Sequence, residues 1–139
     1  MTSRLYMLDT NTVSYIVKGR SAAARARLSG LQGVNVACIS VITEGELLYG
    51  MARSGVAEHL RVSLERFLAR LNVQPWNRAA AASYGTLRAK QESVGKTLGP
   101  LDMLIAAHAI ALGATLVSND RAFQHVPDLA GVENWASDI

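Results

Sequence analysis

The sequence has little cysteine and no long apolar run. Cys38 is the single cysteine among 139 residues, so no disulfide can form within the chain. Its place in the apolar stretch 34–39 predicts an inert, packed thiol, as expected in a reducing cytosol. No apolar run approaches the length that spans a bilayer, and the N-terminus lacks the basic and apolar regions of a signal peptide. We therefore expect a soluble, cytoplasmic protein.

Histidines are also few, and repeats are absent. His59, His108 and His125 lie far apart, so no set of cysteine and histidine has the spacing of zinc ligands. Without repeats, low-complexity tracts or linkers, residues 1–139 are predicted to form one domain, and a 50% hydrophobic content suffices for its core. The formal net charge is only +3, which favours a polyanionic partner without identifying one.

Short apolar runs alternate with helical patterns along the chain. Continuous runs at 5–8, 34–39 and 114–118 predict strands buried on both faces, and shorter strands are expected within 72–76 and 132–135. Helices are expected after the first strand and over 41–52, 56–71, 77–95 and 100–112. This alternation predicts an α/β fold, a three-layer α/β/α sandwich with a mainly parallel central sheet.

Three aspartates lie where an acid is unusual. Asp9 directly follows the first predicted strand, and Asp120 follows the run 114–118 with only Asn119 between. Asp102 interrupts a helix that is apolar on nearly every side. Because the carboxyl ends of parallel strands share one edge of a sheet, we expect Asp9 and Asp120 to converge there. Each acid also has a simpler explanation, as a helix cap, a turn residue or a favourable charge at a helix N-terminus.

The predicted helix 41–52 carries two more acids, Glu44 and Glu46. The side of this helix expected to face the core consists of Val41, Gly45, Leu48 and Ala52. Glu44 and Glu46 lie at opposite margins of that side, so helical spacing alone does not choose between them.

Several carboxylates at one edge would repel one another, which raises their pKa values unless a cation neutralises them. All-oxygen ligands suit Mg²⁺ or Mn²⁺ better than Zn²⁺. Hydrated Mg²⁺ ions held by acids are typical of enzymes that hydrolyse phosphodiesters. The sequence shows no convincing Ser-His-Asp set for covalent catalysis, so the acids predict metal-dependent phosphoryl chemistry.

Three stretches of the chain match a known family. The segments "MLDTNTVSYI", "ISVITEGELLYG" and "GPLDMLIAAHAIALGATLVSNDRAF" resemble the PIN-domain ribonucleases, specifically the VapC toxins of bacterial toxin–antitoxin pairs. The resemblance runs from about residue 5 to about residue 135. It implies an endonuclease that cuts single-stranded RNA with Mg²⁺ or Mn²⁺, forms a homodimer and is inhibited by a VapB-type antitoxin. It also implies that operator DNA is contacted only through the antitoxin.

The resemblance assigns roles to individual residues. It implies catalytic and metal-binding roles for Asp9, Glu46, Asp102 and Asp120. It thereby favours Glu46 over Glu44. Many relatives carry an acid where this chain has Ala122, whereas others use the position of Asp120, so the last assignment is the weakest.

Other polar residues are candidates for supporting roles. Asn11 and Ser118 could orient the carboxylates or simply form turns, and both alternatives stay open. The basic residues proposed to contact RNA phosphates are Lys18, Arg20, Arg88, Lys90, Lys96 and Arg121, and a solvated basic surface is the simpler explanation for each. The "MLDTN" and "TEGELLYGM" segments resemble the VapC group that cuts the anticodon stem-loop of initiator tRNA. Hydrolysis is expected to leave 3′-hydroxyl and 5′-phosphate ends.

Three features of the sequence bear on functions other than that of a nuclease. "LDTNTV" is similar to the acid loop of haloacid-dehalogenase-type phosphatases, but Asn11 replaces its second acid and the chain is short for that fold. "GKT" at 95–97 lacks the earlier glycine and the preceding strand of a phosphate-binding loop. The main alternative is a non-catalytic PIN-like binding module that acts with an antitoxin in regulating its own operon.

Overall fold

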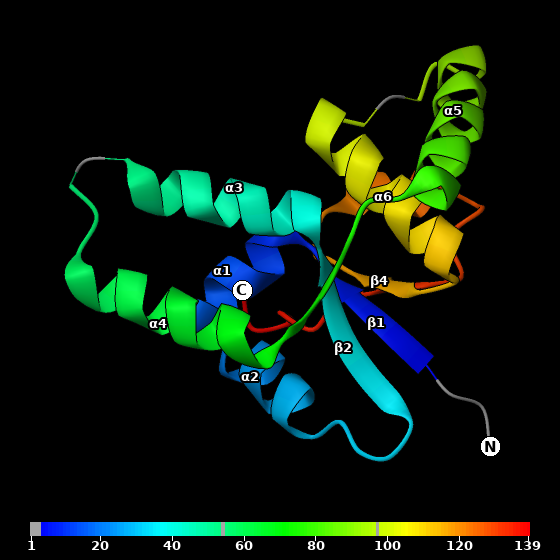
Figure 1. Cartoon of the computed structure of the whole chain (residues 1–139). Helices are drawn as coiled ribbons and strands as arrows, with labels where there is room; N and C mark the ends of the chain where they lie inside the picture. Colours follow the sequence, from blue (N-terminus) through cyan, green and yellow to red (C-terminus); the bar gives the residue numbers. More distant parts are fainter. Residues whose placement is uncertain (1–3, 54, 97) are drawn as a thin grey trace.

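A parallel five-stranded sheet forms the centre of the molecule (Figure 1). The computed structural model describes residues 4–53, 55–96 and 98–139. The strands are β1 (Arg4–Leu8), β2 (Asn35–Ser40), β3 (Asn72–Gln74), β4 (Thr115–Val117) and β5 (Val132–Glu133). Their order is β3-β2-β1-β4-β5, and every neighbouring pair is parallel. All five carboxyl ends therefore lie at the same edge of the sheet.

Helices cover both faces of this sheet. They are α1 (Thr10–Val17), α2 (Ala22–Ser29), α3 (Val41–Ala52), α4 (Glu58–Arg70), α5 (Arg78–Ser93) and α6 (Pro100–Leu112), with a short 3₁₀ helix, η1, at Arg121–His125. One hydrophobic core packs Leu87 of α5 and Ile105 of α6 against Met7. The other packs Val13 of α1 and Leu64 of α4 against Leu8. The predicted α/β sandwich with a parallel sheet is confirmed.

Local signals in the sequence locate several helix ends correctly. The Ser40 hydroxyl accepts a 3.1 Å hydrogen bond from the amide of Ile42 and so caps α3, whose bounds match the prediction. Pro100 lies in the first turn of α6, and Gly113 ends that helix with a φ of 64°. Cys38 is fully buried, and burial raises the pKa of its thiol to about 12, as expected for an inert cysteine. The predicted loop 96–100 includes position 97, which lies outside the described residues.

The prediction for the core-facing side of α3 is wrong. Thr43 and Leu47 are its buried residues, whereas the residues expected inside, Val41, Gly45, Leu48 and Ala52, are exposed. Leu48 is 49% exposed and its neighbour Tyr49 is 69% exposed. Thr43 lies within 3.4 Å of Thr10 of α1, and Leu47 joins the core that α1 and α4 share. The contacts that α3 makes with these neighbours, rather than its most apolar side, determine which way it faces.

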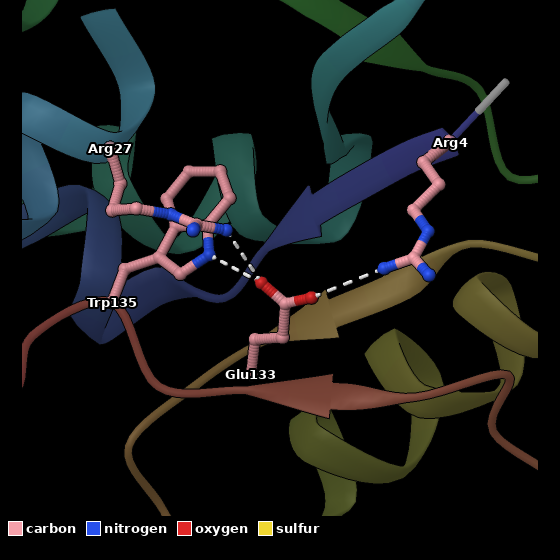
Figure 2. Close-up of polar contacts among 4 residues, drawn as sticks. All are labelled: Arg4, Arg27, Glu133 and Trp135. Atoms are coloured by element: carbon pink, nitrogen blue, oxygen red, sulfur yellow. Dashed lines mark hydrogen bonds and ion pairs between the residues drawn. The ribbon is translucent and has the colours of Figure 1, made fainter. Parts of the chain in front are cut away.

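The sequence does not predict helix α2, because the residues of this helix carry little helical signal of their own. Only Ala24 of this helix is buried. Its N-terminus is capped by the Ser21 hydroxyl, which donates a 2.6 Å hydrogen bond to Asp138 near the end of the chain. Figure 2 shows the second attachment, in which Arg27 donates to Glu133 at 2.8 Å and stacks over the ring of Trp135. The C-terminal segment therefore holds α2 in place.

No helix in the described part of the chain is both long and apolar enough to cross a membrane.

Candidate active site

Four acids from four different elements meet at the carboxyl edge of the sheet. Asp9 follows β1 and Asp120 follows β4 after a short connection, while Asp102 lies in the first turn of α6 and Glu46 lies on α3. The pKa of Asp102 provides the evidence that they converge. Burial raises it first, and the charges of Asp9, Asp120 and Glu46 raise it further, to about 6. Glu44 does not contribute to this shift, so the helix directs Glu46 rather than Glu44 toward the other acids.

Asp9 is the most enclosed of the four acids, with 4% of its surface exposed. Burial raises the pKa of its carboxyl, and hydrogen bonds from Ser118 and Thr12 partly offset that effect. The amide of Thr12 donates to Oδ1 at 2.9 Å, so Asp9 also caps α1. Asp9 is therefore both the cap of α1 and a neighbour of other acids.

Ser118 connects two of the acids. Its hydroxyl favours the ionised form of Asp9, and its Oγ accepts a 3.0 Å hydrogen bond from the backbone amide of Asp120. Ser118 is buried, so these contacts fix its side chain between the ends of β1 and β4. This placement is what an orienting residue requires.

Glu46 is held by a residue that the sequence did not single out. The Thr10 hydroxyl donates a 2.7 Å hydrogen bond to Oε1 of Glu46, and it lies 3.4 Å from the hydroxyl of Thr43. Thr10 follows Asp9 in the chain, so one connection carries both a carboxylate and the donor that positions a second one. The sequence offers one indication of a role for Thr10, which is its position directly after Asp9 at the end of a strand.

Asp120 differs from the other acids because its side chain caps the 3₁₀ helix. Oδ1 accepts a 2.9 Å hydrogen bond from the amide of Ala122, and the residue is exposed. The charge of Asp120 still raises the pKa of both Asp9 and Asp102, so it lies within electrostatic reach of the cluster. It is therefore a turn residue as well as a neighbour of the other acids.

The chain is similar over most of its length to known proteins of one family. Residues 6–129 match the PIN domain family. The chain is 40% identical over 131 residues to Ribonuclease VapC2 of Haemophilus influenzae, with 94% of this chain and 97% of the relative covered. It is 36% identical to the tRNA(fMet)-specific endonuclease VapC of Shigella flexneri, again with 94% of this chain and 98% of the relative covered. This chain belongs to the VapC ribonucleases of the PIN-domain family.

Solved structures of VapC proteins have the same fold. The VapBC2 complex of Rickettsia felis, bound to a DNA fragment from its promoter, contains a chain that superposes with a TM-score of 0.88 at 37% identity, covering 94% of this chain and 98% of that one. The DNA-bound VapBC of Salmonella typhimurium gives a TM-score of 0.86 at 35% identity, covering 96% and 99%. The likeness therefore extends over nearly the full length of each matched chain.

The donor atoms of this VapC-family site fit a hard divalent cation. The side chains recorded in contact with the acids within the described residues offer carboxylate and hydroxyl oxygens as possible metal ligands, which favours Mg²⁺ or Mn²⁺ over Zn²⁺. Among residues 4–53, 55–96 and 98–139, no three acidic, histidine or cysteine side chains are placed to ligate one ion together. Mg²⁺ commonly uses one or two carboxylates and keeps several water ligands, so the arrangement suits a hydrated ion.

The remaining candidate residues fall into two groups. Arg121 directly follows Asp120 and is exposed, and Lys96 is exposed in the connection that leads to α6. Lys18 and Arg20 follow the C-terminal end of α1, about 12 Å along the helix from the end that Asp9 caps, so they do not flank the acids as expected. Asn11 is exposed, and no hydrogen bond links its side chain to an acid within the described residues.

Two further basic candidates are engaged elsewhere. Arg88 contacts Tyr84 and Glu92 on its own helix, and Lys90 pairs with Asp128 at 3.0 Å. Asn119, unlike Asn11, has a recorded partner for its side-chain amide, which donates a 3.5 Å hydrogen bond to the Tyr15 hydroxyl. Of the six proposed RNA contacts, Arg121 is the one that directly follows an acid of the cluster, and Lys96 is exposed in the connection before α6.

Proposed function

We propose that this chain is a metal-dependent endoribonuclease toxin that cuts a single-stranded loop of tRNA and so inhibits translation in the cytoplasm. The observation that carries the proposal is that Asp9, Glu46 and Asp120 lie within electrostatic reach of Asp102, whose pKa is raised to about 6 by burial first and by their charges second. A bound cation would offset the repulsion among these like charges and favour their ionised forms. The whole chain, 1–139, acts as one PIN-like domain in this proposal.

The chain's own residues would hold the ion and the scissile phosphate. Asp9, Glu46 and Asp102 would hold a hydrated Mg²⁺, either directly or through its water ligands, with Mn²⁺ as a substitute, and Asp120 would add charge at the margin. Mg²⁺ supplies charge neutralisation of the phosphodiester, a lowered pKa for water and stabilisation of the leaving oxygen. Thr10 and Ser118 donate hydrogen bonds to Glu46 and Asp9, and these contacts orient the two carboxylates.

The substrate class follows from the relatives and from the surface around the acids. The Shigella flexneri relative is named for its action on tRNA(fMet), and this chain shares 36% of its residues. Asp120 and Arg121 are exposed at this edge, and a splayed RNA loop would reach the partly buried acids better than a stacked helix would. The anticodon loop of initiator tRNA is therefore the first substrate to test.

The deciding experiment compares wild type with Asp9→Asn on total cellular RNA and on initiator tRNA. Asparagine keeps the oxygen that caps α1, so the variant is expected to fold while losing the charge. Asp128→Asn is the matched control, since it removes one exposed acid that pairs with Lys90 outside the cluster. We expect one discrete cut with a new 5′-phosphate end, in Mg²⁺ but not in EDTA, by wild type and the control only.

The alternative, a non-catalytic binding module, makes the opposite prediction. In that case neither wild type nor the control cleaves RNA in Mg²⁺, and only complexes with an antitoxin and operator DNA form. Undiminished cleavage by Asp9→Asn would instead remove the acid cluster from the mechanism.

A VapB-type antitoxin is the proposed partner, and a groove on the α1–α2–α4 side suits one. Apolar residues Ile16, Leu28 and Phe67 line this groove of about 510 Å³, and Arg66 and Arg70 stand along it. A segment with apolar side chains and carboxylates would be complementary in shape and charge. Phe67→Asp should abolish capture of the cognate antitoxin, and unchanged capture would place the antitoxin elsewhere. Operator DNA would reach the complex only through the antitoxin.

A homodimer is proposed through the exposed side of α3. Leu48 and Tyr49 are large apolar side chains exposed on one helix, next to Leu101 at the start of α6. A second copy of the chain would cover this patch, which monomeric proteins rarely leave bare. The patch borders Glu46, so dimerisation would bring two acid clusters toward one RNA.

A further inference from the structure

His108 is a buried polar residue that the proposed chemistry does not use. It lies in α6 among the alanine and isoleucine side chains of the core and is only 1% exposed. An imidazole in such a place lowers stability unless both of its nitrogens have partners. Both do, and the partners belong to two other parts of the fold.

The hydrogen bonds of His108 form one directional chain. Nδ1 lies 2.8 Å from the hydroxyl of Ser40, which is itself fully buried, and the carbonyl of Pro75 accepts a hydrogen bond from the ring. Because that carbonyl can only accept, Nε2 carries the hydrogen and Nδ1 accepts from Ser40. Ser40 in turn accepts from the amide of Ile42 at 3.1 Å, where α3 begins. Burial lowers the pKa of His108, so the ring is neutral, as this chain of donors requires.

These contacts join the two helices that carry acids. Ser40 caps α3, and Glu46 lies six residues further along that helix. His108 lies on α6, six residues beyond Asp102. Ser40 and Glu46 are thus about 9 Å apart along α3, and His108 and Asp102 are about 9 Å apart along α6. The contact between Ser40 and His108 therefore lies at the same distance along each helix from the acid that the helix carries.

We propose that His108, through its hydrogen bond to Ser40, is a positioning residue that sets the separation of Glu46 and Asp102 and hence the affinity of the site for a divalent cation. Thr10 fixes the Glu46 side chain, and Ser40 fixes the start of the helix that carries it. Within the described residues no side-chain hydrogen bond holds Asp102, so its place follows that of α6, which the His108–Ser40 contact ties to the start of α3. The edge of Trp76 packs on the imidazole at 5.6 Å between ring centres and keeps the ring from turning. This inference rests on the proposed function.

The test separates positioning from stability by replacing one ring nitrogen at a time. The amide of asparagine can take the place of Nδ1 and keep the contact with Ser40, whereas glutamine reaches the place of Nε2 and keeps only the contact with Pro75. His108→Leu removes both. Gln91→Leu is the control, because Gln91 is another buried side chain, and it ties α5 to the carbonyl of His125 at the opposite end of η1 from Asp120.

Mn²⁺ affinity, read from the electron paramagnetic resonance of the free ion, is measured beside the melting temperature and the rate of RNA cleavage. We expect His108→Leu and His108→Gln to bind Mn²⁺ about ten-fold more weakly than wild type and His108→Asn to recover most of that loss. Gln91→Leu should lower the melting temperature with wild-type Mn²⁺ affinity. Should His108→Leu fail to fold, Ser40→Ala replaces it, with the same expected loss of affinity.

Three results would overturn the inference. They are wild-type Mn²⁺ affinity in folded His108→Leu or Ser40→Ala, equal recovery by asparagine and glutamine, and an equal loss of affinity in Gln91→Leu. Failure of the proposed function looks different, because then Asp9→Asn would cleave RNA as well as wild type does. If Asp9→Asn is inactive and His108→Leu binds Mn²⁺ normally, only the positioning role is lost.

Discussion

The Thr10 hydroxyl donates a 2.7 Å hydrogen bond to Oε1 of Glu46, which lies 36 residues further along the chain. This contact links α1 to α3 beside Asp9, and it points a half-buried glutamate toward the other acids. Because a hydrogen bond to a charged acceptor fixes both partners more firmly than one between neutral groups, Thr10 determines where Glu46 is available to a cation.

Thr10→Val tests this contact, because valine keeps the shape of the side chain and removes its donor. We expect cleavage of RNA to fall about ten-fold, which corresponds to about 1.4 kcal/mol, while Thr10→Ser keeps at least half of the wild-type rate. The rate is measured at saturating and at limiting Mg²⁺, and the loss should be larger at limiting Mg²⁺. Equal rates for the valine and serine variants would show that the hydroxyl has no part in positioning Glu46.

The pKa of Asp102 predicts a gain of stability on removing its charge. Burial and the neighbouring acids raise this pKa from 3.8 to about 6, so the folded state binds the proton more tightly than the unfolded state does. Ionisation of Asp102 therefore destabilises the fold fully above about pH 6 and not at all well below about pH 4. Without divalent ions, Asp102→Asn should be about 1–2 kcal/mol more stable than wild type at pH 7.5, a value reduced for partial solvent screening.

Urea unfolding in EDTA at both ends of that pH range measures the difference. Added Mg²⁺ should then stabilise wild type at pH 7.5 and have little effect on Asp102→Asn, since the variant lacks one of the proposed ligands. A variant that is less stable than wild type at pH 7.5 would contradict the predicted repulsion among the acids.

Asp120 is expected to have two separable roles. Asp120→Asn keeps an oxygen for the amide of Ala122 and removes only the charge, so it should leave stability unchanged and weaken Mn²⁺ binding several-fold. Asp120→Ala should weaken Mn²⁺ binding equally and also lower the free energy of unfolding by about 1 kcal/mol. Calorimetric titration with Mn²⁺ and thermal melts distinguish the two. If both variants bind Mn²⁺ as wild type does, Asp120 is a turn residue alone.

The exposed patch on α3 predicts the behaviour of the chain in solution. Leu48 is 49% exposed, so Leu48→Glu should fold normally while its charge opposes burial against a second copy. Sedimentation equilibrium is expected to give a dimer for wild type and a monomer for the variant. Val94→Glu, which changes an exposed apolar residue at the end of α5, serves as the control and should remain dimeric. A monomeric wild type would rule out the proposed dimer.

The attachment of the C-terminal segment to α2 predicts a loss of stability. Trp135 is buried against Tyr6 at 5.3 Å between ring centres, so Trp135→Ala should lower the free energy of unfolding by about 3–5 kcal/mol. Trp135→Phe removes the 3.0 Å hydrogen bond to Glu133 but keeps most of the packing, and should cost about 1 kcal/mol. Denaturant unfolding measures both. Similar losses for the two variants would show that the hydrogen bond, not the packing, holds this segment.

Short-range features of the chain were predictable because they depend on a few neighbouring residues. Ser40 begins a helix and Gly113 ends one for reasons of local hydrogen bonding and backbone conformation, and both act as expected. Continuous apolar runs also specify the buried strands. Together they place Asp9 and Asp120 at strand ends, and a parallel sheet then brings those ends to one edge.

Contacts between distant segments were not predictable, because nothing near them in the sequence encodes them. Helix α2 has one buried residue and depends on Glu133, Trp135 and Asp138, more than 100 positions away. Neighbouring helices determine which side of α3 faces the core, so the side that was expected to be buried is exposed instead.

The amino-acid sequence by itself determined the strands, most of the helices and the positions of the acids, since each is a local pattern of apolar and capping residues. Only the tertiary structure decided that Glu46 is held by Thr10, that Asp102 carries a raised pKa and that His108 meets Ser40. Hydrogen bonding and charge repulsion act across distances in space, and those distances exist only once the helices have packed on the sheet.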